Sequence, residues 1–72
     1  MSRTPNQIAF GARVRKLREE QGHTQAHLAF QAGIARNYLG EVERGMRNIA
    51  LENIMRLAGA LRVKSTQLMP DS

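Results

Sequence analysis

The sequence predicts an all-α domain of five helices, for two reasons. Apolar residues recur three or four positions apart along most of the chain, which is the spacing of helices that bury one face. Capping residues, glycines and prolines stand where these apolar stripes begin or end. With 72 residues, the chain has room for one domain, 1–72, with a modest core, and domains of this size are often supported by oligomerisation.

Charge and composition narrow the classes of function. A net charge of +5 and a pI of about 11.2 favour a polyanionic partner, although a merely basic soluble surface explains them equally well. The absence of cysteine excludes disulfides and thiolate metal sites, and three aromatic residues are too few for a single-strand stacking platform. The apolar runs are too short to span a membrane and no signal-peptide pattern opens the chain, so a soluble cytoplasmic protein is expected.

The first helix is expected from Pro5 to about Gln21. Thr4 is a suitable N-cap, because proline follows at the first helical position and a glutamine stands three residues after the cap; Gly22 ends the helix. Ile8 falls opposite the apolar stripe, where it covers the N-terminal turn or meets a partner chain. The expected buried stripe consists of Phe10, Val14 and Leu17.

The segment 24–45 is the one around which the rest of the chain is organised. Two short helices are expected, from Gln25 to Gln31 behind the Thr24 cap and from about Ala35 to Glu43. Gly33 lies between them, where a tight turn often needs positive φ. Two helices, a short turn containing glycine and crossed packing define a helix-turn-helix.

This segment resembles the helix-turn-helix of the phage Cro/repressor-like (XRE-type) DNA-binding family. That family has glutamine, alanine and glycine at the first, fifth and ninth positions and aliphatic residues at the tenth, fifteenth and eighteenth. The corresponding residues, which the sequence ERG follows, are Gln25, Ala29, Gly33, Ile34, Leu39 and Val42. The run ARNYLGEVERGMRN is also similar to the recognition segment of restriction–modification controller proteins, which are small dimeric regulators. The resemblance covers roughly residues 10–69 and implies a five-helix Cro/repressor-like domain.

The resemblance also implies roles for residues that flank the third helix. An arginine at position 18 pairs in the family with the glutamate of the ERG motif, so Arg18 and Glu43 are expected to form a structural ion pair. Gln25 contacts the DNA backbone in the family or supports the reading residues; a plain polar first-turn residue is the alternative. The loop after the third helix runs along the phosphate backbone, and a solvated loop is the alternative for its donors, Arg44, Arg47 and Asn48.

The third helix is expected to contact the bases. With its apolar stripe inward, Arg36, Asn37, Gly40 and Glu41 project from the other side. Arg36 can bond to guanine O6 and N7 and Asn37 to adenine N6 and N7, although a solvated surface residue is the alternative for Arg36. Glu41 either accepts from a cytosine amino group or keeps phosphates at a distance. Controller proteins use the matching Arg-x-Tyr positions in DNA contact, which adds Tyr38, with core-edge packing as its alternative.

The remaining segment, about 50–69, is expected to support the motif and to mediate dimerisation. One helix spans Ala50 to Leu61 or Arg62, and Ser65 caps a short fifth helix that Pro70 ends. The expected buried stripe consists of Leu51, Ile54, Leu57, Ala58 and Leu61. The segment has more apolar residues than so small a domain needs here, and in the family these helices supply the dimer contact. The expected homodimer interface consists of Met55, Leu61, Val63, Leu68 and Met69.

No metal, cofactor or small-molecule ligand is expected. His23 and His27 are four residues apart, which on one helix suits a zinc pair. However, His23 precedes the helix and no further ligand completes a site. Both are therefore interpreted as surface histidines.

The sequence thus predicts a sequence-specific, double-stranded DNA-binding transcriptional regulator. A dimer places two reading helices about 34 Å apart in successive major grooves, so a roughly palindromic operator is expected. A controller protein, a phage-type repressor and the antitoxin of a toxin–antitoxin pair all fit, and a protein-interaction module on the same fold is the alternative from another class. An enzyme is disfavoured, because the sequence has no nucleophile–base set, phosphate-binding glycine loop or metal cluster.

Overall fold

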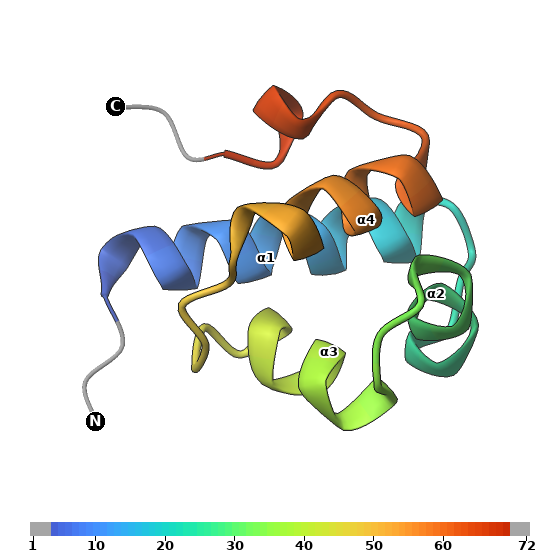
Figure 1. Ribbon diagram of the computed structural model, residues 1–72, viewed down its shortest axis with the longest axis horizontal. Helices are drawn as coiled ribbons and strands as arrows, with labels where there is room; N and C mark the ends of the chain where they lie inside the picture. Colours follow the sequence, from blue (N-terminus) through green and yellow to red (C-terminus); the bar gives the residue numbers. More distant parts are fainter. Residues whose placement is uncertain (1–3, 70–72) are drawn as a thin grey trace.

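A computed structural model describes residues 4–69, which form four α-helices and one 3₁₀ turn (Figure 1). The α-helices are α1 (Pro5–Glu20), α2 (Gln25–Ala32), α3 (Arg36–Glu43) and α4 (Leu51–Leu61), and the 3₁₀ turn is η1 (Ser65–Gln67). The all-α prediction is confirmed for these residues. None of the described helices has the length and apolar character needed to cross a membrane.

The prediction of a fifth α-helix is wrong. After α4 the chain makes only η1, in which the Leu68 N–H donates to the Ser65 carbonyl at 3.0 Å. Ser65 is the first residue of this turn and not its cap; the flanking residue is Lys64, whose N–H donates to Gln67 Oε1 at 2.8 Å. Few residues separate α4 from Leu68, which is fully buried in the core, and a tight turn spans that connection. Pro70 lies outside the described residues.

The predicted helix caps and the predicted turn are confirmed. The Thr4 and Gln7 side chains each accept a hydrogen bond from the other residue's N–H, at 3.1 and 2.8 Å, which is a capping box. Thr24 Oγ1 accepts from the His27 N–H at 3.1 Å and starts α2. Gly33 ends α2 with φ +72°, and this left-handed residue turns the chain into α3.

One apolar core lies between the four α-helices. α1 packs chiefly on α3, and α2 packs on α4 and α3, so α3 is covered from two sides (Figure 1). The largest fully buried side chains come from all four helices and from the residue after η1: Val14, Leu28, Leu39, Val42, Leu57, Leu61 and Leu68. Because Leu39 and Val42 of α3 point into the core, the residues on the opposite side of α3 remain at the surface.

α1 and α3 approach each other so closely that only glycine fits at position 11. A Cβ at Gly11 would overlap the carbonyl oxygen of Val42 and lie 2.8 Å from that of Glu43. Near the start of α1, Ile8 lies against Gly45 in the turn after α3, where an added Cβ would be 2.9 Å from Ile8 Cα. Contact between α1 and the end of α3 therefore extends over several turns of α1.

Candidate nucleic-acid interface

The first turn of α3 presents two polar side chains to solvent. Arg36 and Asn37 are both exposed, whereas Leu39 and Val42, on the opposite side, are 0% and 2% exposed. Arginine offers a planar fork of donors, and asparagine offers an amino donor group and a carbonyl acceptor on the same amide. These are the groups that match the major-groove edges of guanine and adenine.

Gly40 does not project from this face as predicted, because it is buried. A Cβ at Gly40 would lie 3.5 Å from Arg44 Nη1 and 3.7 Å from Gln25 Oε1, so side chains from α2 and from the end of α3 lie over it. The prediction considered only the position of Gly40 around the helix axis. It took no account of side chains from neighbouring segments that cover this glycine.

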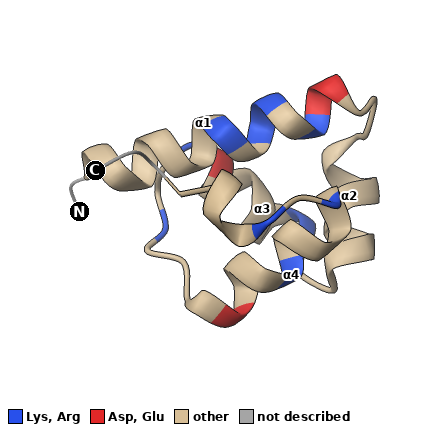
Figure 2. Ribbon diagram, turned by 90° about the horizontal axis from the view of Figure 1, so that it is seen from above, with Lys and Arg blue, Asp and Glu red and all other residues tan. Residues whose placement is uncertain are grey.

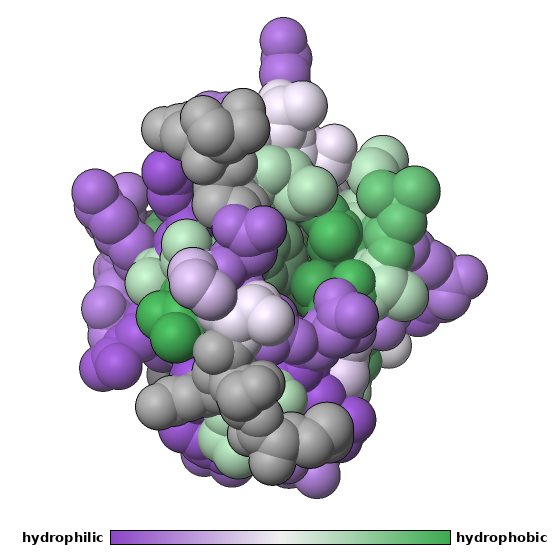
Figure 3. All heavy atoms as spheres, turned by 90° about the vertical axis from the view of Figure 1, so that its left-hand side faces the viewer, coloured by the Kyte–Doolittle hydropathy of each residue, from purple (hydrophilic) through white to green (hydrophobic). Residues whose placement is uncertain are grey.

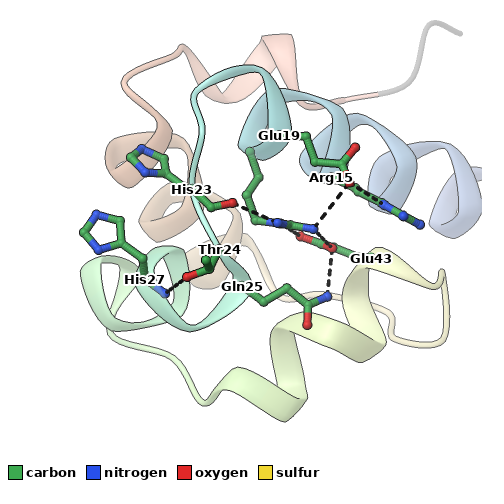
Figure 4. Close-up of polar contacts among 8 residues, drawn as sticks. Arg15, Glu19, His23, Thr24, Gln25, His27 and Glu43 are labelled. Atoms are coloured by element: carbon green, nitrogen blue, oxygen red, sulfur yellow. Dashed lines mark hydrogen bonds and ion pairs between the residues drawn. The ribbon is translucent and has the colours of Figure 1, made fainter.

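The C-terminal end of α3 is anchored by a buried carboxylate. The structure brings Arg18 and Glu43 together: Arg18 Nε and Nη2 donate to the two Glu43 oxygens at 2.7 and 3.0 Å (Figure 4). Only 3% of the Glu43 side chain and 11% of the Arg18 side chain are exposed. Arg18 Nη1 also donates to the His23 carbonyl at 2.9 Å, and the hydrogen bonds that the guanidinium donates to Glu43 raise the pKa of Arg18. One guanidinium thus joins α1, the α1–α2 link and α3.

Gln25, the first residue of α2, belongs to the same hydrogen-bonded group. Its Nε2 donates to Glu43 Oε1 at 3.0 Å, and in Figure 4 its side chain points toward Glu43. Together with its approach to Gly40, this bond makes Gln25 a support for α3 from the side of α2.

A second polar group lies on the surface beside the exposed face of α3. Arg47 Nε donates to Glu41 Oε1 at 2.8 Å, and the guanidinium carbon of Arg47 lies 5.4 Å from the centre of the Tyr38 ring. The Tyr38 hydroxyl accepts from Asn53 Nδ2 of α4 at 3.2 Å. Tyr38 is half-buried and packs against the core, so its position is compatible both with packing at the core edge and with DNA contact. Asn53 was not predicted, since nothing in its sequence context signals a partner on α3.

Basic residues are not confined to this side of the molecule. Figure 2 shows lysine and arginine on α1, on α4 and on the connecting segments. The loop residues Arg44, Arg47 and Asn48 are exposed, as the phosphate-contact prediction requires. Because charge is distributed widely, the residue types on α3 identify the candidate interface more sharply than the net charge does.

The predicted dimer surface needs correction. Leu61 and Leu68 are 0% exposed within a single chain, because both point into the core beneath η1, and they are unavailable to a partner. Met55 and Met69 are exposed and Val63 is half-buried. Leu51, predicted to be buried, is 69% exposed, since the first turn of α4 extends beyond the core. Figure 3, which views the molecule from the left-hand side of Figure 1, shows apolar side chains grouped on one part of that face with polar side chains around them.

The two histidines lie beside each other at the start of α2. Their ring centroids are 4.8 Å apart with a 34° tilt, and both rings point away from Glu43 (Figure 4). Among residues 4–69, no group of three or more histidine, cysteine or acidic side chains converges as a metal site would require.

Comparison with known proteins places this geometry in a family. The helix-turn-helix family model matches residues 14–68, which is more than half of the chain. The control protein C.BamHI of Bacillus amyloliquefaciens is 36% identical over 63 residues, covering 86% of this chain and 78% of the relative.

Solved structures agree with that assignment. The restriction-modification controller protein C.AhdI from Aeromonas hydrophila is similar with a TM-score of 0.86 and 46% identity, over 88% of this chain and 96% of the other. The master regulator for biofilm formation SinR, solved in complex with DNA, is similar with a TM-score of 0.79 and 30% identity, over 82% and 95% of the two chains. This chain therefore belongs to the helix-turn-helix family, with the Cro/repressor-like fold.

Proposed function

We propose that this protein is a transcriptional regulator that binds double-stranded DNA sequence-specifically through α3. The observation that carries the proposal is the exposed pair Arg36 and Asn37 on the first turn of a helix whose other side is held by the core and by Glu43. A rigid helix with base-reading groups at its N-terminal turn suits insertion into the major groove. The similarity to controller proteins and to SinR supports the same function.

The proposed contacts fall into two groups. Arg36 and Asn37 read base edges, with Tyr38 and Glu41 beside them, and each good bidentate contact contributes about 1–3 kcal/mol of discrimination between bases. Arg44, Arg47 and Asn48 contact phosphates and fix the register of α3 on the duplex. Gln25 positions α3 through Glu43 and, as the first residue of α2, contributes a further contact to the same DNA backbone.

We further propose that the protein acts as a two-fold homodimer. Leu51 and Met55 are one turn apart on α4 and Met69 follows η1, so three exposed apolar side chains from this segment are available to a partner. Val63 lies at the edge of the same segment. Sedimentation equilibrium at tens of micromolar tests this: a dimer is expected, and Met55→Glu should give a folded monomer because Met55 is exposed in the single chain.

A controller protein of a restriction–modification system is the proposed role, and a phage-type repressor or an antitoxin uses the same DNA contacts. The similarity to control proteins from Bacillus amyloliquefaciens and Aeromonas hydrophila favours the first. A protein-interaction module on this fold has one observation in its favour, the 84% exposure of Phe30 on α2. That side chain lies outside the α3 surface and leaves the DNA-binding proposal intact.

Selection from a random duplex pool at about physiological salt tests the proposal directly. Enrichment of a motif with two related halves about ten base pairs apart is the expected result for a dimer. A single enriched half-site would retain DNA reading without a pre-formed dimer. If a folded protein enriches no motif, the interaction module becomes the better interpretation.

The selected operator then allows a test of the reading residues. Arg36→Ala should lower the preference for the operator over scrambled duplex by roughly 1–3 kcal/mol, because a base contact is lost. Arg15→Ala, which removes an exposed arginine from α1, is the matched control and should leave that preference unchanged. Equal loss of preference in both variants would remove Arg36 from the reading group.

A further inference from the structure

We propose that Glu41 is a specificity-determining residue that acts through Arg47. In the free protein Glu41 holds Arg47 in an ion pair on the α3 surface. On the correct operator the pair is exchanged: Arg47 moves to a phosphate, and the Glu41 carboxylate accepts from a base amino group. On other DNA the pair stays closed and limits non-specific affinity. This inference rests on the DNA-binding function proposed above.

Glu41 lies where it meets any DNA that α3 approaches. It lies one helical turn after Asn37, and therefore on the same side of α3 as that proposed reading residue. A carboxylate at this place faces the phosphates of any duplex that α3 approaches, and is unfavourable there unless it is paired. In the free protein its partner is Arg47, at 2.8 Å.

Arg47 is held beside Glu41 by two contacts. Its guanidinium donates to Glu41 and lies over the Tyr38 ring at 5.4 Å, and the ring is itself held by Asn53. Arg47 is thus kept close to α3 by a charge and by an aromatic face, although it belongs to an irregular loop. While this pair persists, its net charge is zero, and the loop attracts phosphates with one cation fewer.

The pair between Arg47 and Glu41 is partly exposed to solvent. The Arg47 and Glu41 side chains are 52% and 31% exposed, so water screens their attraction and a phosphate can replace the carboxylate. After that replacement Glu41 needs a new donor. Cytosine N4 and adenine N6 supply one in the major groove, but only where the sequence places them within reach. The exchange is therefore complete on the operator and incomplete elsewhere, which is a source of specificity.

The test compares Glu41→Gln with wild type on the selected operator and on a scrambled duplex, at several salt concentrations. Glu41→Gln should bind the scrambled duplex roughly three- to tenfold more tightly, because Arg47 is released toward phosphate. The gain on the operator should be smaller, so the ratio of the two affinities falls. The slope of log affinity against log salt on the scrambled duplex should steepen by about 0.9, the value for one further phosphate contact.

Glu20→Gln is the matched control, since it removes the same charge from the exposed end of α1. A second background decides whether Glu41 acts through Arg47. In Arg47→Ala, adding Glu41→Gln should leave the salt slope unchanged, because no arginine is left to be released. Equal steepening in both backgrounds, or no difference between Glu41→Gln and Glu20→Gln, would overturn the inference. If wild type discriminates between no duplexes at all, the proposed function fails, and the inference fails with it.

Discussion

α3 has two glutamates two positions apart, and each is paired with an arginine from another segment. Glu43 is 3% exposed and receives three hydrogen bonds, two from Arg18 and one from Gln25. Glu41 is 31% exposed and receives one, from Arg47. Because a two-residue step turns a helix by more than half a turn, the two carboxylates face opposite environments. The same kind of ion pair, arginine with glutamate, is therefore buried on one side of α3 and open to solvent on the other.

The energetic consequences differ accordingly. Removing one partner of a buried pair leaves the other charge buried with neither a partner nor water around it, which typically costs about 3–5 kcal/mol. Removing one partner of an exposed pair leaves a charge that water solvates, at a cost of about 0–1 kcal/mol. A domain of 72 residues has a total stability of roughly 4–11 kcal/mol, so the first change is severe and the second is minor.

The largest expected effect is that of Glu43→Gln. The substitution leaves Arg18 buried with a neutral partner, and we expect the free energy of unfolding to fall by about 3–5 kcal/mol. Glu41→Gln, the same change on the exposed side, should lower it by less than about 1 kcal/mol. Urea unfolding followed by circular dichroism measures both values. Similar losses of unfolding free energy in the two variants would mean that the buried pair and the exposed pair contribute equally to stability.

Gly11→Ala should come next. Its Cβ would meet the Val42 and Glu43 carbonyls at the α1–α3 junction, so the helices must separate and the Arg18–Glu43 pair must lengthen. Overpacking of this kind costs about 1–3 kcal/mol, and backbone atoms cannot rotate away. Gly59→Ala is the control, since its Cβ meets nothing within 4 Å on an exposed part of α4, and it should stabilise by about 0.5–1 kcal/mol. Thermal unfolding of the two variants should shift in opposite directions.

A third prediction concerns the N-terminal end of α3, which has no anchor equivalent to Glu43. Ala35 precedes the helix in an extended conformation and makes no side-chain capping bond. Ala35→Ser should therefore stabilise the domain by about 1 kcal/mol, whereas Thr24→Ala should destabilise it by about as much by removing the cap of α2. No gain from Ala35→Ser in denaturant unfolding would show that the position already satisfies its first amides in another way.

The smallest expected effect is that of Tyr38→Phe. The substitution removes the hydroxyl that accepts from Asn53 while the ring stays beneath Arg47, so the cost should be about 0.5 kcal/mol, at the low end for a partly exposed hydrogen bond. Asn53→Ala removes the other partner and should cost about the same. A double-mutant cycle on unfolding free energies measures the coupling, and a value near zero would remove Asn53 as a support of the Arg47 site.

Some features of the site could be predicted from local pattern. Thr4, Thr24 and Gly33 lie where the helix boundaries were expected, because caps and left-handed turns depend on a few neighbouring residues. The exposure of Arg36 and Asn37 followed from the inward stripe of Leu39 and Val42. Leu68 could not be placed in this way: an apolar residue after the last α-helix suits a core or a dimer surface equally, and only the path of η1 decides between them.

The sequence by itself determined the four α-helices, most of their buried residues, the resemblance to the family and the residue types offered by α3, because periodicity, capping and motif spacing are all local properties. Only the tertiary structure decided that Gly40 is covered, that Leu51 is exposed, that Gly11 admits no side chain and that Arg47 reaches Glu41. Each of these depends on how close two separate segments come. That distance results from the packing of the whole core, which no short stretch of sequence specifies.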